Sequence, residues 1–159
     1  MCSSSSRAAV QALVGELGRR AGIDGLALDA AGMVALQVDG HLVLHVAVEE
    51  DEEAASALLY VPVGGLPGQG RERLLRRLLE ANLAGRGDPV VGLHGASERV
   101  VLLVAFRPAT ADWAGFERLV EGLLARAEEL AAEIAAEGGT PDDGQAISDL
   151  RLMSMGLRA

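Results

Sequence analysis

The sequence predicts an α+β fold with the element order helix, three strands, helix, two strands, helix. Three long segments repeat their apolar residues every three or four positions, the spacing of one helix face, and five shorter segments are apolar in alternation or without interruption. An Asp-Gly pair at residues 39–40 separates two of the short segments and is the strongest hairpin signal in the chain. We therefore expect a mostly antiparallel, twisted sheet with helices packed on it.

The first helix is expected over residues 7–20, because the serines at residues 3–6 can cap a helix that starts directly after them. A glycine-containing segment at residues 22–25 then ends it. One face of this helix collects its larger apolar side chains, Val10, Leu13, Val14 and Leu17.

The first three strands are expected over residues 33–38, 41–48 and 57–63, with a short extended piece at 26–28. Pro62 has no N–H to donate to a ladder, so the third strand is expected to lie at a sheet edge or to end there. Strand side chains alternate between faces, and one face of the second strand is expected to be core. It carries Leu42, Leu44, Val46 and Val48.

The second half is expected to form a helix at residues 71–83, strands at 89–94 and 100–106, and a long helix at 110–136. Residues 100–106 are apolar without interruption, which is typical of a strand covered on both faces. We expect the two helices to sandwich this part of the sheet. The leucines of the shorter helix are expected to form a single stripe, Leu74, Leu75, Leu78, Leu79 and Leu83.

A length of 159 residues predicts one domain, which we place at residues 1–136, followed by a polar and mobile tail at 137–159. The net charge of −9 disfavours nucleic acid and anionic membrane surfaces as partners. The single cysteine, Cys2, excludes an intrachain disulfide, and no segment has the character of a signal peptide or a membrane span. We expect a cytoplasmic protein.

No arrangement of residues predicts an active site or a metal site. His41 and His45 share one face of a strand, but four residues along a strand span roughly 13 Å, too far for one metal ion. Cys2 lies in a terminal serine run, and no serine occupies a nucleophile elbow. We expect no enzymatic activity, no metal and no cofactor.

Three helices cannot cover both faces of a five-stranded sheet in so short a chain, so some apolar surface is expected to remain for another subunit or a ligand.

The second half also carries a resemblance to a known family. A leucine-paired helix reading LLRRLLEANL at residues 74–83 is followed by a glycine-containing link, the short strand at 89–94, a turn, the apolar strand at 100–106 and a helix that opens near Asp112-Trp113. This order and spacing resembles the Tir chaperone family, the class I chaperones of bacterial type III secretion. The resemblance covers most of residues 7–136.

The resemblance implies a cytoplasmic homodimer that binds the N-terminal segment of a secreted effector in extended form and keeps it soluble and competent for secretion. An extended chain can add a strand to a free sheet edge and place apolar side chains in grooves. The family's effector contacts map to Val10, Leu13, Leu17, Val34, Leu36, Leu42 and Leu44. Its dimer contacts map to Leu75, Leu79, Val91, Leu93, Val101 and Leu103. Each of these side chains has ordinary core packing as its alternative.

Two other classes of function stay open at the level of the sequence. One is a dimeric α/β signalling or scaffold protein that binds a folded partner. The other is a small enzyme or phosphate-binding protein that uses the glycine-rich loop at residues 64–70 with Arg71 or Arg73. This loop and the extended tail depart from the usual family pattern.

Overall fold

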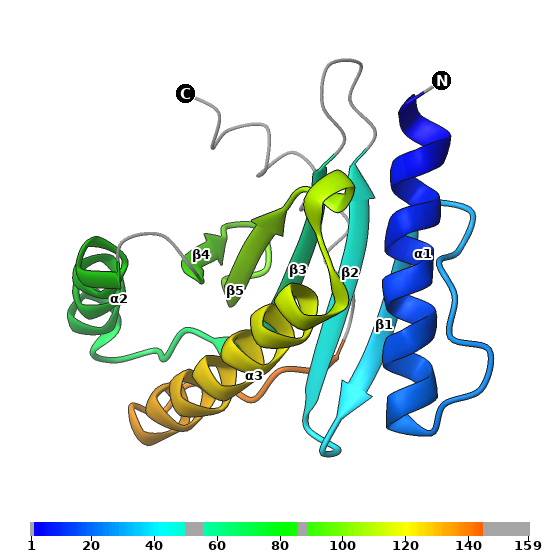
Figure 1. Ribbon diagram of the computed structural model, residues 1–159. Helices are drawn as coiled ribbons and strands as arrows, with labels where there is room; N and C mark the ends of the chain where they lie inside the picture. Colours follow the sequence, from blue (N-terminus) through cyan, green and yellow to red (C-terminus); the bar gives the residue numbers. More distant parts are fainter. Residues whose placement is uncertain (1, 50–55, 86–88, 145–159) are drawn as a thin grey trace.

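The computed structural model describes residues 2–49, 56–85 and 89–144 (Figure 1). Its elements follow the predicted order of helix, three strands, helix, two strands and helix, with one added 3-10 turn. They are α1 (Cys2–Ala21), β1 (Met33–Val38), β2 (Leu42–Glu49), β3 (Ser56–Gly65), α2 (Arg71–Gly85), β4 (Val90–His94), β5 (Arg99–Phe106), η1 (Pro108–Thr110) and α3 (Trp113–Ala136).

The strands form one antiparallel sheet in the order β1-β2-β3-β5-β4. The predicted α+β class and antiparallel sheet are therefore confirmed. Asp39 and Gly40 both have positive φ, 49° and 78°, as a tight hairpin between β1 and β2 requires. β3 lies in the middle of the sheet, and β1 and β4 are its edges.

The prediction that Pro62 places its strand at an edge is wrong, because β3 is central. The structure accommodates the missing N–H in two ways. The ladder between β2 and β3 ends at the pair His45–Tyr60, so Pro62 has no partner in β2. On the other side, the register with β5 shifts between Pro62 and Gly64, as at a β-bulge.

α1 and α3 cover one face of the sheet, and the main core lies between them and the strands (Figure 1). The side chains of β2 that were expected to face the core, Leu42, Leu44, Val46 and Val48, are all buried there. α3 contributes a stripe at helical spacing, Phe116, Val120, Leu123, Ala127, Leu130 and Ile134.

The expected sandwich of two helices around the sheet is not what forms. α2 lies beside β4 at the end of the sheet (Figure 1) and buries Leu74 and Leu78 in the same core as α1 and α3. The opposite face carries a separate buried cluster to which the described helices contribute no residue: Ala47, Leu58, Tyr60, Val101 and Leu103.

Several expected elements differ locally. α1 begins at Cys2 instead of residue 7. α3 begins at Trp113, where the Asp112 side chain accepts a hydrogen bond from the Gly115 N–H at 2.7 Å and caps the helix. Residues 26–28 are outside the strands, with Leu26 and Leu28 packed against the main core.

After α3 the chain returns to the sheet. Gly65 donates its N–H to the Thr140 carbonyl at 2.9 Å, and the Thr140 N–H donates back to Gly65 at 3.2 Å. Arg99 forms an ion pair with Asp142 and donates from Nε to the carboxylate at 2.8 Å. Residues 138–144 thus pack on the body within the segment expected to be a tail, and residues 145–159 lie outside the described residues.

Candidate partner-binding surfaces

The β1 edge of the sheet has backbone groups available to an added strand. The Val48 N–H donates to the Gly32 carbonyl at 2.9 Å, so alternation along the ladder turns the N–H and C=O groups of residues 33, 35 and 37 away from β2. At Met33 both outward groups already have a partner in Asp29. The Met33 N–H donates to the Asp29 side chain at 2.9 Å, and the Met33 carbonyl accepts from the Asp29 N–H at 2.8 Å. Ala35 and Gln37 carry the outward groups beyond this point, and both residues are exposed.

The β4 edge is closed at Val91, the second of its 5 residues, by a side chain of α2. Asn82 donates from Nδ2 to the Val91 carbonyl at 2.8 Å and accepts from the Val91 N–H at 2.8 Å. This side chain takes both outward backbone groups of Val91, as a neighbouring strand would. Of the two edges, β1 is therefore the better template for strand addition.

α2 presents a second apolar surface, on the side that faces away from the core. Leu75 is half-buried, whereas Leu79 is 69% exposed and Leu83 is 84% exposed. These three leucines are four residues apart and so lie on one face of the helix. They line a shallow hollow of about 460 Å³ together with Glu72, Arg76 and Glu80.

The orientation of α2 is fixed from its other side. Leu74 and Leu78 are buried in the main core, and Arg77 forms ion pairs with Glu133 and Glu137 of α3. The leucines expected to form one stripe therefore split into a buried pair and an exposed row. We call Leu75, Leu79 and Leu83 the α2 stripe.

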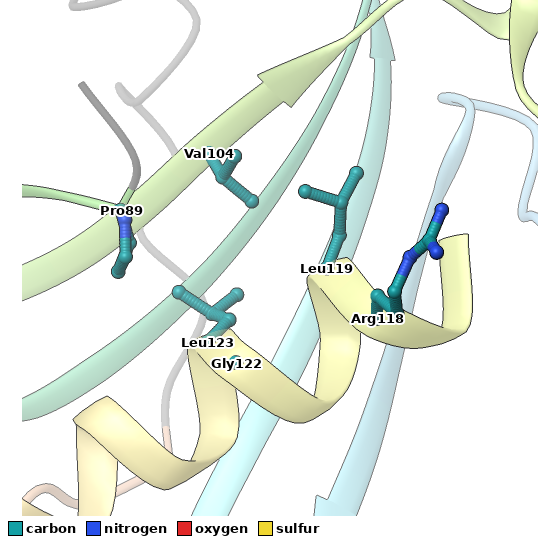
Figure 2. Close-up of a pocket in the computed structure, with 6 residues that line it drawn as sticks. All are labelled: Pro89, Val104, Arg118, Leu119, Gly122 and Leu123. Carbon is teal, nitrogen blue, oxygen red and sulfur yellow. The ribbon is translucent and has the colours of Figure 1, made fainter. Parts of the chain in front are cut away.

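A third surface is a small apolar hollow of about 120 Å³ between β5, α3 and the residue that precedes β4 (Figure 2). Val104, Leu119 and Leu123 project toward one another there, and Pro89 lies on the far side (Figure 2). Gly122 contributes no side chain, and a Cβ at that position would meet no atom within 4 Å. The sequence argument missed this hollow, although a glycine within a Leu- and Ala-rich helix was a signal for it.

The residues that the resemblance assigns to effector contact fall into a half-buried group and a buried group. Leu17 of α1 and Val34 and Leu36 of the edge strand β1 are half-buried. The remaining four lie inside the main core, where core packing was their stated alternative: Val10, Leu13, Leu42 and Leu44. A partner on the surface meets the first group, and the second group supports the strands beneath it.

The residues assigned to the dimer interface lie on three different surfaces. Leu75 and Leu79 belong to the α2 stripe, with Leu83 as a member that the prediction omitted although its spacing was visible. Val91 and Leu93 are half-buried in β4 and pack against the main core. Val101 and Leu103 are buried in the cluster on the opposite face of the sheet.

The arginines beside the glycine-rich loop are held in ion pairs. Arg71 is bound to Glu98, and Arg73 to Glu137, so both arginines beside the glycine-rich loop already have carboxylate partners. Each arginine holds the pKa of its carboxyl below the usual range, mainly through the side-chain hydrogen bond. This pairing disfavours the phosphate-binding alternative.

His45 is the buried polar residue of the sheet. It is stacked on Tyr60, with ring centroids 4.5 Å apart, and burial lowers the pKa of its imidazole to about 4. No group of three or more His, Cys, Asp or Glu side chains among the described residues is arranged to hold a metal ion. None of the helices in that part of the chain is long and apolar enough to cross a membrane.

Comparison with known proteins gives a family and a set of similar folds. A sequence model of the Tir chaperone protein (CesT) family matches residues 12–131. Among curated protein sequences there is no significant match. A chain of the crystal structure of the ExsC–ExsE complex is 26% identical, with a TM-score of 0.68 over 79% of this chain and 92% of that one.

Two further structures have the same fold at lower identity. One is a chain of the HopA1–SchA chaperone–effector complex, 19% identical, with a TM-score of 0.65 over 80% of this chain and 97% of that one. The other is from the Yersinia pestis type III secretion chaperone SycH in complex with a fragment of YscM2, 19% identical, with a TM-score of 0.60 over 76% and 98% of the two chains.

Proposed function

Because the chain belongs to the Tir chaperone protein (CesT) family, we propose that it binds the N-terminal segment of a secreted effector in extended form. It is a type III secretion chaperone, and binding of this kind keeps the effector soluble and competent for secretion. Similar folds occur in complexes described as chaperone–effector pairs, which supports the same kind of partner here.

The observation that carries the proposal is the open edge of β1. Ala35 and Gln37 present backbone groups to which an extended segment can bond, whereas Asn82 already occupies both outward backbone groups of Val91 on the opposite edge. Backbone pairing gives affinity without requiring one sequence, and side chains on alternate residues then supply specificity. Leu17, Val34 and Leu36 beside this edge are the apolar contacts we assign to the bound segment.

We assign the homodimer contact to the α2 stripe. Leu79 and Leu83 are, with Ile23, the large apolar side chains that stand exposed in the described part of the chain. A row of such side chains in one protomer is covered when it meets the same row in a second protomer around a two-fold axis. The half-buried residues of β4, Val91 and Leu93, lie next to α2 and can extend this contact.

The proposed activity requires no cofactor, metal or nucleotide and makes no covalent change in the partner. We place the protein in the bacterial cytoplasm, where an effector is held before export.

The experiment that tests the proposed function is capture of partners from the cytosol of the native bacterium, followed by mass spectrometry. The bait is the full chain, and light scattering counts its subunits. We expect a dimer that recovers one or two secreted proteins, and we expect removal of each partner's N-terminal segment to abolish recovery. Recovery of folded cytosolic proteins alone would instead support a signalling or scaffold protein.

A further inference from the structure

The face of the sheet opposite α1 and α3 is buried although the described helices do not cover it. Tyr60 and Val101 are fully buried there, and His45, Ala47 and Leu103 are at most 5% exposed. Sheet faces bury apolar side chains against a second layer. The cluster on this face therefore needs a cover, and none of residues 138–144 belongs to the cluster.

The chain itself leads onto this face. Thr140 pairs with Gly65 at the end of β3, and Asp142 is bound to Arg99, whose side chain lies on the same face as Val101. A Cβ built on Gly144 would lie 3.2 Å from Cγ2 of Val43, which shares this face with His45. The described chain thus ends at Gly144 on the border of the buried cluster.

The sequence that follows Gly144 contains enough large apolar residues to cover an apolar sheet face. Its large apolar residues are Ile147, Leu150, Leu152, Met153, Met155 and Leu157. Fifteen residues extend up to about 50 Å, and neighbouring strands are only about 4.8 Å apart, so the segment is long enough to cross the sheet. The buried Nε2 of His45 has no hydrogen-bond partner among the described residues, and a polar group of this segment can supply one.

We propose that residues 145–159 dock across the second face of the sheet and close the cluster around Tyr60. The chain's own C-terminus takes this place in preference to a second copy, because Thr140 and Asp142 already hold its beginning there and so raise its local concentration. Val101 and Leu103 then lie under the C-terminal segment, and the dimer contact falls to the α2 stripe.

Tyr60 reports on this docking because it is the only tyrosine in the chain. The experiment measures nitration of Tyr60 by tetranitromethane in a Cys2→Ser background, which removes the thiol that the reagent also oxidises. We expect nitration to be about tenfold or more faster in a chain truncated after Gly144 than in the full chain, because the ring loses its cover. A peptide of residues 145–159 added in excess is expected to restore slow nitration.

Full-length variants provide the matched comparison and replace the truncated chain if it fails to fold. The pair Leu150→Asp and Met153→Asp is expected to speed nitration, whereas Ser148→Asp and Ser154→Asp add the same charge at polar positions and leave it slow. Trp113, the only tryptophan and located on the helix-covered side, reports by its fluorescence that the fold is intact. Equal rates with and without residues 145–159, slow or fast, would overturn the proposal. Protection that is lost on dilution to monomers would assign the face to a second copy.

Discussion

His45 is the residue whose chemistry differs most from its ordinary behaviour. Its ring stacks on that of Tyr60, and β2, the strand to which it belongs, is paired with β1 on one side and β3 on the other. Burial lowers the pKa of the imidazole to about 4; Asp142 raises it and Arg99 lowers it by smaller amounts. The ring is therefore neutral in the folded protein at neutral pH.

This lowered pKa predicts a loss of stability at mildly acidic pH. The unfolded chain binds a proton at His45 below about pH 6.5, whereas the folded protein binds it only near pH 4, so the free energy of unfolding falls as the pH falls between these values. We expect a loss of about 2 kcal/mol between pH 7 and pH 5. Urea unfolding at both pH values measures it.

The matched variant for this prediction is His45→Gln, which cannot be protonated in that range. It is expected to flatten the dependence between pH 7 and pH 5, whatever its effect on stability at pH 7. Side-chain hydrogen bonds from arginine lower the pKa values of three carboxyl groups, those of Glu16, Glu98 and Glu137. The stability that these carboxylates contribute is lost mainly below about pH 5, outside the range of pH 5 to 7 that is measured. An unchanged slope in the variant would mean that another group is responsible.

The sequence predicted little of this residue's environment. Alternation along the strand placed His45 opposite the core-facing leucines, and nothing in the pattern of this strand showed that its second face is also buried. The uninterrupted apolar run at residues 100–106 indicated cover on both faces, but only for that strand. The contact between Arg99 and Asp142 joins residues 43 positions apart, and a charged pair at that separation has no local signature.

At the scale of elements, the leucine spacing of α2 predicted the helix but not which of its faces is buried. The leucine spacing correctly predicted a helix beginning at Arg71, and it assigned all five leucines to one stripe. Their spacing covers two adjacent helix faces, and the tertiary contacts of α2 with β4 and α3 decide which face is buried. The tertiary contact of Arg77 with Glu133 is one that the sequence does not encode locally.

The split of these leucines predicts different outcomes for neighbouring substitutions. Leu79→Asp together with Leu83→Asp is expected to give a folded monomer, because both side chains are exposed in the protomer and a charge there opposes only the dimer contact. Leu78→Asp is expected to unfold the protein, since a charge in the main core costs several kcal/mol. Sedimentation velocity and circular dichroism distinguish the two results.

Ala125→Asp is the control for this experiment, because it places the same charge at an exposed position of α3. It is expected to remain a dimer. A dimer that persists in the Leu79→Asp, Leu83→Asp variant would move the interface away from the α2 stripe, with β4 as the next surface to test.

At the scale of the whole molecule, the sequence predicted the kinds and order of the elements but not their arrangement. The hairpin of β1 and β2 followed from Asp39-Gly40, since a tight turn with positive φ at both residues brings neighbouring strands together. The placement of β5 between β3 and β4 involves pairs about 40 residues apart, which no local pattern specifies. Pro62 shows the same limit, because a bulge and a shortened ladder override its usual preference for an edge.

The surfaces of the whole molecule have separate roles in this account. We propose the β1 edge for the effector segment, the α2 stripe for the contact between protomers, and the second face of the sheet for the C-terminal segment. Each surface lies on a different side of the sheet, so a dimer can hold an extended partner on both protomers without breaking its own contact.

The central claim is that an extended effector segment adds to the β1 edge, and calorimetric titration of the captured effector's N-terminal segment into an Ala35→Pro variant tests it most directly. Ala35 turns its N–H away from β2, so proline removes a donor for the incoming strand and leaves the β1–β2 ladder intact. We expect binding to weaken about tenfold or more, because a backbone hydrogen bond and the continuity of the added strand are both lost. Ala35→Val keeps the N–H and is expected to bind like the wild type. Wild-type affinity in a folded Ala35→Pro variant would contradict strand addition at this edge.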